Sequence, residues 1–180
     1  MSTAGRVDAA LTRPALVHGS LPPGGRDLDL LVEAADLGAL RALGAPDLDL
    51  SVAADWDLPA GELAWLRSTA RPLPPHTHLV RPAPAADLLL LALRDLAAGP
   101  LSQRHRERLR RALEDPAALP QARQRAAAWR VPVSLEALVA AVDGQPGTAL
   151  RYRHARERQR RTGPPRLARV RAVRRALLPG

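Results

Sequence analysis

The pattern of apolar residues in the sequence changes near residue 80, and this change constrains the fold more than any other feature. Before it, apolar runs of four or five residues are separated by Gly and Pro, as in strands joined by turns. These runs are residues 15–18 (ALVH), 28–32 (LDLLV) and 48–52 (LDLSV). Residues 33–43 are rich in Ala and Leu and end at Gly44, which predicts a short helix. The order of these elements predicts a small mixed α/β layer.

After residue 80 the patterns become helical. Residues 87–97 are apolar on all sides, which predicts a helix buried among other helices. Ser102 and Ser134 are predicted N-caps, and Pro120 suits a first helical turn. The further predicted helices are residues 103–113, 120–129, 135–142, 147–161 and 166–178. The last of these is amphipathic and basic.

The predicted fold class is therefore α+β, with three parts. Residues 1–80 form the sheet layer, residues 81–146 a helical subdomain, and residues 147–180 an Arg-rich helical tail. Four helices of about ten residues are enough for a compact helical subdomain.

The net charge of +9 is divided unevenly along the chain. Residues 1–150 hold 16 Arg and 17 acidic residues, whereas residues 151–180 hold 11 Arg and one acid, Glu157. The basic character thus belongs to the last thirty residues. It does not indicate that the body of the protein binds nucleic acid.

Other features exclude several classes of protein. The absence of Cys excludes disulfides, thiolate zinc sites and cysteine nucleophiles. The N-terminal segment carries charges at Arg6, Asp8 and Arg13 and has no apolar stretch of signal-peptide length. The most apolar run, residues 88–93, is far shorter than the roughly 20 residues that span a bilayer. We expect a soluble cytoplasmic protein with no membrane span.

One constellation could carry chemistry. His18-Gly19-Ser20 is followed by a Pro/Gly turn and then by Asp27 and Asp29, which share one face if residues 28–32 form a strand. Two converging carboxylates repel each other, and Mg²⁺ binds through a few carboxylates together with substrate phosphates. Gly19 leaves the backbone open to a phosphate, and Ser20 offers a hydroxyl and an amide N–H.

A third carboxylate would complete a two-metal site. The run at residues 47–52 offers Asp47 and Asp49. Asp49 is the preferred candidate because it lies deeper in the run, although one strand face can carry both.

Three segments of this sequence, in order, resemble the motifs of the nucleotidyltransferase superfamily of the DNA polymerase beta type: LVHGS, RDLDLLV and LDLSV. The Leu-rich helix that follows (PAADLLLLALRDL) is similar to that of bacterial nucleotidyltransferase-like proteins, and the resemblance covers roughly residues 10–145. It implies transfer of a nucleoside monophosphate from a nucleoside triphosphate (NTP) to a hydroxyl acceptor, with two Mg²⁺ ions. By this likeness Gly19 and Ser20 hold nucleotide phosphates, and Asp27, Asp29 and Asp49 hold Mg²⁺, Asp49 also assisting deprotonation of the acceptor.

The same residues also have simpler, purely structural interpretations. Asp27 and Asp29 could be solvated acids on an edge strand, neutralised by Arg26. His76 and His78 have a metal-like spacing, but no third ligand is evident and a solvated loop is favoured. At least two of the three Trp are expected to be core anchors.

The basic tail, residues 151–180, also has alternatives. It could bind nucleic acid or anionic lipid electrostatically, dock a protein partner, or be a linker remnant. Tyr152 is its only aromatic residue, so any nucleic-acid binding should be poorly specific. The second functional hypothesis is accordingly a non-catalytic module that keeps the fold and binds a partner or nucleic acid through this tail.

Overall fold

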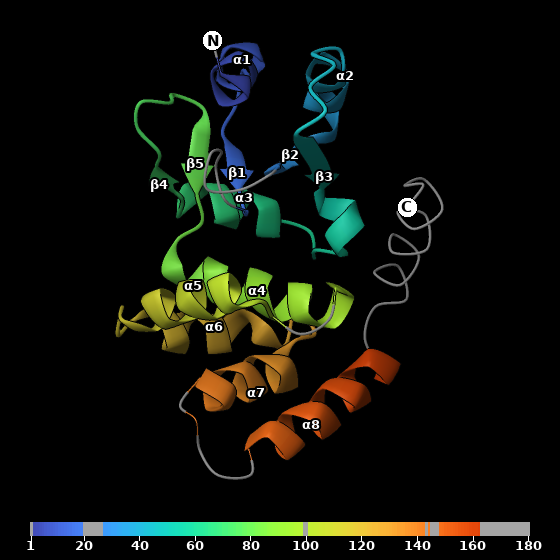
Figure 1. The fold of residues 1–180 in the computed structure, drawn as a ribbon, viewed down its shortest axis with the longest axis vertical. Helices are drawn as coiled ribbons and strands as arrows, with labels where there is room; N and C mark the ends of the chain where they lie inside the picture. Colours follow the sequence, from blue (N-terminus) through green and yellow to red (C-terminus); the bar gives the residue numbers. More distant parts are fainter. Residues whose placement is uncertain (1, 20–26, 99–100, 143, 145–147, 163–180) are drawn as a thin grey trace. The chain divides into compact units, whose positions relative to one another are not determined.

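The structure of the chain is a computed structural model that describes residues 2–19, 27–98, 101–142, 144 and 148–162. The chain divides into two units, Met1–Ala83 and Pro84–Gly180, here called the sheet unit and the helical unit (Figure 1). The predicted mixed α/β class is confirmed. The division falls three residues beyond the predicted boundary at residue 80, and the part of the predicted tail that is described belongs to the helical unit.

The sheet unit contains a five-stranded mixed sheet in the order β3-β2-β1-β5-β4. Its strands are β1 (Ala15–Val17), β2 (Leu28–Val32), β3 (Leu48–Val52), β4 (Arg71–Pro72) and β5 (Leu79–Arg81). β2 runs antiparallel to β1 and parallel to β3, while β5 runs parallel to β1 and antiparallel to β4. β2 and β3 have the predicted bounds, and β1 ends one residue earlier than predicted.

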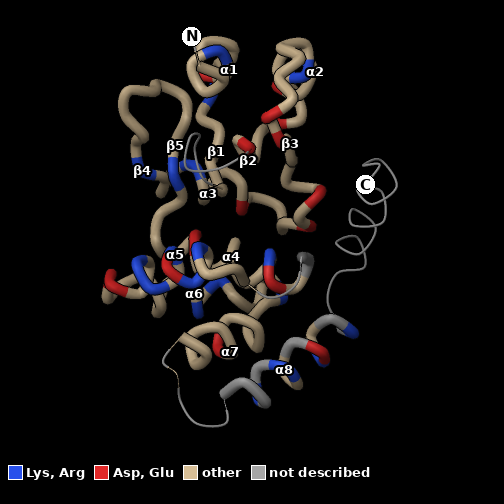
Figure 2. The backbone as a smooth tube through the Cα atoms, in the orientation of Figure 1, with Lys and Arg blue, Asp and Glu red and all other residues tan. Residues whose placement is uncertain are grey.

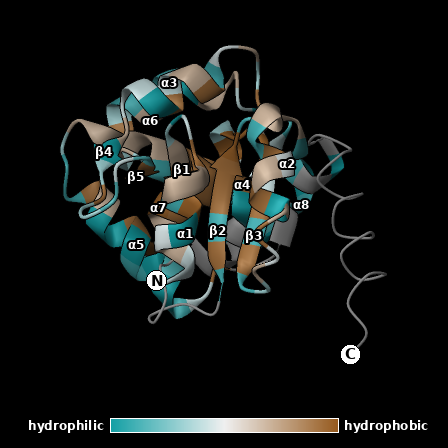
Figure 3. Cartoon of the chain, turned by 90° about the horizontal axis from the view of Figure 1, so that it is seen from above, coloured by the Kyte–Doolittle hydropathy of each residue, from teal (hydrophilic) through white to brown (hydrophobic). Residues whose placement is uncertain are grey.

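One face of the sheet packs against helices α1 (Thr3–Ala10) and α2 (Leu37–Arg41), which lie above the strands in Figure 1. Side chains alternate along a strand, so β2 sends Leu28, Leu30 and Val32 into this core and turns Asp29 to the opposite face. Figure 3 shows the apolar colouring of β2. The buried members of the core are Val7, Leu11, Ala15, Val17, Leu28, Leu30, Val32, Leu40, Leu73 and Leu79.

The predicted helix at residues 33–43 is present in a shorter form. A 3₁₀ turn, Ala34–Asp36, leads into α2, and the chain leaves the helix at Gly44. Gly44 has a φ of 57°, a left-handed conformation that glycine adopts without strain, and its N–H donates to the Arg41 carbonyl. The 3₁₀ turn at Ala53–Trp56 and α3 (Glu62–Ser68) follow β3, and α3 contacts β1.

The helical unit contains α4 (Pro84–Ala98), α5 (Gln103–Leu113), α6 (Ala118–Ala126), α7 (Pro132–Val142) and α8 (Thr148–Thr162). Helix α4 contacts all four of the others, and residues 88–93 are buried on every side, as predicted. No helix in the described part of the chain is long and apolar enough to cross a membrane.

The two predicted serine caps have different outcomes. Ser102 caps α5, because its hydroxyl accepts the N–H of His105. Ser134 does not cap α7: the helix begins two residues earlier at Pro132, which suits a first turn because it has no N–H to satisfy. Ser134 is instead a buried residue of that first turn.

Candidate functional site

Asp29 and Asp49 lie directly opposite each other in the sheet. β2 and β3 are parallel, and their register pairs these two residues. Neighbouring strands are about 4.8 Å apart, and residues that are directly opposed project from the same face. That face is opposite the apolar core, and both acids are half-buried. The acidic residues along β2 and β3 are visible in red in Figure 2.

Gly19 lies against the carboxylate of Asp29. A Cβ atom at Gly19 would be 1.9 Å from Asp29 Oδ2 and 2.7 Å from its Cγ, so only a glycine fits without displacing that side chain. The N–H of His18 donates to the Asp29 carbonyl over 3.1 Å and fixes the approach of the two strands. The backbone that leaves β1 is therefore beside the paired carboxylates. Ser20, the predicted partner of Gly19, lies outside the described residues.

Asp47 and Asp49 occupy different environments. The Asp47 carboxylate accepts a hydrogen bond from the Thr3 hydroxyl over 3.1 Å, which ties it to α1. Its carbonyl accepts the N–H of Leu28 over 2.7 Å. Of these two predicted third carboxylates, Asp49 is the one that the register places opposite Asp29.

Asp27 is exposed in the bend before β2. Among the residues that the structure describes, no three His, Cys, Asp or Glu side chains are grouped so as to hold a metal ion. The sheet therefore brings Asp29 and Asp49 together and does not gather Asp27 with them. Two carboxylates are nevertheless a suitable donor set for one Mg²⁺, which commonly takes one or two carboxylates and completes its octahedral shell with phosphates and water.

A second polar group on β3 adjoins the acids. Ser51 follows Asp49 by two residues and so lies on the same face. The Ser51 hydroxyl donates to the Leu30 carbonyl over 3.0 Å and accepts the indole N–H of Trp56 over 3.0 Å. His18 Nε2 is 3.4 Å from the same hydroxyl. The site thus has an ordered polar wall beside its carboxylates.

The rings of His18 and Trp56 complete this wall. Their centroids are 5.1 Å apart and their planes are inclined by 78°, an edge-to-face contact. The two-residue period of a strand could have identified Ser51 from the sequence. Trp56 could not be assigned in that way, because the 3₁₀ turn after β3 brings it back onto the sheet.

The tryptophans differ in burial. Trp129 is 3% exposed and anchors the core of the helical unit. Trp56 and Trp65 are half-buried, so only one of the expected core anchors is fully enclosed.

The segment that contains His76 and His78 is a loop, as predicted, but it is tied to α1. The backbone N–H groups of Thr77, His78 and Leu79 donate to the Asp8 carboxylate over 2.9, 2.7 and 2.9 Å. Burial raises the pKa of Asp8, but these three donors and the nearby His76 outweigh it, so the pKa lies below its ordinary value. Asp8 therefore anchors the approach to β5, and the two histidines are half-buried beside it.

A scan of protein-family models, a search of curated proteins and a search of solved structures each found no match to this chain.

Proposed function

We propose that the chain is a Mg²⁺-dependent nucleotidyltransferase that moves a nucleoside monophosphate from an NTP to a hydroxyl acceptor. The observation that carries the proposal is the pairing of Asp29 with Asp49 across β2 and β3, with the Gly19 backbone against the Asp29 carboxylate. The proposal requires a phosphate holder beside a metal holder, and these residues supply both types of group.

The chemistry of the donors supports Mg²⁺ and a polyphosphate. Asp29 and Asp49 offer hard oxygen ligands, which Mg²⁺ prefers, and the ion retains free positions for phosphate oxygens. The absence of a side chain at Gly19 lets the Asp29 carboxylate lie directly against the backbone that leads to the predicted phosphate contact. The succession of an apolar strand, Gly-Ser and two Asp-bearing strands also underlies the resemblance to the polymerase beta type of nucleotidyltransferase.

In the proposed reaction, the acceptor oxygen forms a bond to the α-phosphorus as the bond from that phosphorus to pyrophosphate breaks. The hydroxyl proton passes to the Asp49 carboxylate, and pyrophosphate leaves with the displaced electron pair. Bound Mg²⁺ supplies neutralisation of the phosphate charge. Asp27, exposed before β2, remains a predicted Mg²⁺ ligand, and Ser20 remains a predicted phosphate contact.

Calorimetry with a panel of NTPs, in the presence and absence of Mg²⁺, tests this function. The wild type is expected to bind an NTP only with Mg²⁺. An Asp29→Asn/Asp49→Asn double variant should bind it about 100-fold more weakly, because the loss of residues that support a metal site lowers metal affinity by factors of this size. Asp47→Asn is the matched control, because Asp47 is bonded to Thr3, and it should bind as the wild type does. Absence of NTP binding, or equal affinity in the double variant, would refute the function.

Gly19→Ala tests whether the position of the Asp29 carboxylate against the Gly19 backbone matters for binding. The new methyl group overlaps the Asp29 carboxylate, so we expect it to turn that ligand away and to weaken Mg²⁺-NTP binding by about tenfold. Gly38→Ala is the control, because no atom outside its chain neighbours and its own helix backbone lies within 4 Å of the methyl group that it would add. Unchanged nucleotide binding in Gly19→Ala would show that the Asp29 carboxylate does not take part.

A further inference from the structure

Helix α8 is docked through one of its faces. Ala155 and Gln159 are 9% and 7% exposed. Gln159 Oε1 accepts the backbone N–H of Ser134 over 2.7 Å, and Gln159 Nε2 donates to the Arg130 carbonyl. The side chain thus satisfies one free N–H in the first turn of α7 and one carbonyl before it. These contacts set which side of α8 faces α7.

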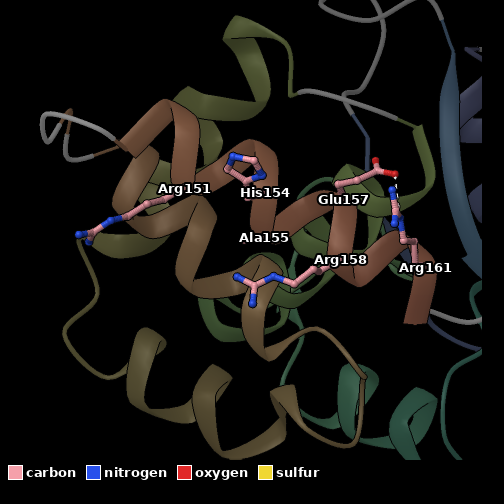
Figure 4. Close-up of a pocket in the computed structure, with 6 residues that line it drawn as sticks. All are labelled: Arg151, His154, Ala155, Glu157, Arg158 and Arg161. Atoms are coloured by element: carbon pink, nitrogen blue, oxygen red, sulfur yellow. Dashed lines mark hydrogen bonds and ion pairs between the residues drawn. The ribbon is translucent and has the colours of Figure 1, made fainter.

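A different side of α8 carries a row of basic residues. Arg151, His154, Arg158 and Arg161, here called the α8 stripe, recur every three or four residues and therefore share one flank of the helix. All four are exposed. Together with Ala155 and Glu157 they line a hollow of about 750 Å³, in which the side chains of Arg151 and Arg158 extend in the same direction along the helix (Figure 4).

The charge of this flank is strongly positive. Glu157 is its single acid, and it pairs with Arg161 over 3.4 Å on the exposed surface. Residues 151–180 as a whole hold 11 Arg and no acid besides Glu157. A surface of this composition attracts polyanions and repels cations.

The dimensions of the stripe suit a chain of phosphates. Residues 151 and 161 are separated by about 15 Å along the helix axis, at 1.5 Å per residue. Successive phosphates of one strand of duplex DNA rise by about 3.4 Å, so the stripe spans about four of them. Guanidinium groups present forked donors that match phosphate oxygens.

Helix α5 is also rich in Arg but is arranged differently. Its residue Arg108, which forms a two-bond ion pair with Asp87 of α4, is half-buried, whereas the members of the α8 stripe are exposed. The exposed Arg residues of α5 fall on two faces, with Arg106 and Arg110 on one and Arg104 and Arg111 on the other. It therefore lacks a single continuous row.

From these observations we propose that the α8 stripe binds the phosphate backbone of a nucleic acid. The stripe has no Phe, Tyr or Trp side chain on which bases could stack, and Tyr152 is the only residue of these three types in 151–180. Recognition therefore depends on phosphate charge and not on base sequence. The proposal is independent of the nucleotidyltransferase function, because it uses none of the acids on the sheet.

Fluorescence anisotropy of labelled nucleic acids of about 20 nucleotides, titrated with the full chain, tests the proposal. Single-stranded RNA, single-stranded DNA and duplex DNA are compared. An Arg151→Gln/Arg158→Gln/Arg161→Gln variant should bind roughly 10- to 100-fold more weakly at about 0.1 M salt. Its slope of log affinity against log salt should fall by about 2, since each single-strand phosphate contact contributes about 0.7.

An Arg106→Gln/Arg110→Gln/Arg111→Gln variant is the matched control, since it removes the same charge from exposed positions on α5. Its affinity for nucleic acid should fall by less than about threefold. Asp29→Asn/Asp49→Asn should bind nucleic acid as the wild type does, which separates failure of this proposal from failure of the enzymatic one. Circular dichroism of each variant reports that the helices are retained.

Three results would overturn the proposal. Equal losses in the two triple variants would show diffuse charge attraction, and binding that is insensitive to salt would exclude phosphate contacts. Tighter binding of phosphatidylserine vesicles than of any nucleic acid would assign the stripe to a lipid surface.

Discussion

The two units place their charged groups by different physical means. In the sheet unit, Asp29 and Asp49 are twenty residues apart in the chain and meet only because β2 pairs with β3 in one register. In the helical unit, the α8 stripe follows from the period of a single helix. A site on a sheet therefore depends on strand pairing, whereas a stripe on a helix is already present in the local sequence.

The interactions that hold each unit differ in the same way. Asp8 joins α1 to backbone groups about seventy residues later in the chain, at the approach to β5. Gln159 joins α8 to Ser134 and Arg130, which are 25 and 29 residues earlier. If this contrast is correct, loss of Asp8 should damage its unit more than loss of Gln159 damages the other.

The largest effect is expected for Asp8→Asn. An amide cannot replace a carboxylate that accepts three backbone donors, so the free energy of unfolding should fall by about 3 kcal/mol. Urea unfolding followed by the fluorescence of Trp56 and Trp65 measures it. Asp47→Asn, which weakens one hydroxyl hydrogen bond, should lose only about 1 kcal/mol. Equal losses in the two variants would contradict the anchoring role.

The lowered pKa of Asp8 also sets a pH dependence. The unfolded carboxyl titrates near pH 3.9. Its native pKa is lower, so the stabilisation is complete above that pH and is lost as the pH falls through the native pKa. In Asp8→Asn this part of the acid sensitivity should disappear, as a titration of unfolding free energy in the acid range would reveal.

A smaller loss is expected for Gln159→Leu in the helical unit. The substitution keeps a side chain of similar bulk but removes both hydrogen bonds of the amide, which should lower the free energy of unfolding by about 2 kcal/mol. Trp129 fluorescence and hydrogen exchange at Ser134 report the change. The exposed Glu157→Gln is the control and should stay within about 0.5 kcal/mol. A loss as large as that of Asp8→Asn would erase the contrast between the units.

The smallest effect concerns His105 in α5. Burial, followed by Arg94, Arg108 and Arg104, lowers the pKa of His105 to about 4. The unfolded chain, with a His pKa near 6.5, takes up the proton first as the pH falls, so the helical unit loses stability between about pH 6.5 and 4. His105→Gln should flatten the melting temperature across this window. Because the ring is half-exposed, the change should be modest, and an unaltered profile would contradict it.

Prediction from the sequence succeeded where the signal was local. β2, β3 and α5 have their predicted bounds because an apolar run, an alternation or a serine cap marks each of them. β4 was missed because Arg71–Pro72 has no apolar run and becomes a strand only by pairing with β5. Ser134 was mistaken for a cap because the preceding Pro132 is an equally good start for the helix.

The candidate site also depends on both levels. The sequence offers Asp29 together with Asp47 and Asp49 as alternatives for a third acid. The register adds that Asp49 lies opposite Asp29, while the Asp47 carboxylate accepts a hydrogen bond from Thr3. The polar wall joins His18, which follows β1, to Ser51 and Trp56 of β3 and the 3₁₀ turn after it, so the contact between these two segments is not visible in the sequence.

The sequence by itself determined the mixed class, the change from strands to helices near residue 80 and the concentration of Arg after residue 150. It also showed that each of two predicted strands carries an Asp. Each of these follows from the composition or periodicity of a short segment. Only the tertiary structure decided that Gly19 lies on Asp29, that Asp49 is the opposing acid, and that Gln159 holds α8 against α7. These contacts depend on the pairing of distant segments, which is set by the free energy of the assembled unit and by no local pattern.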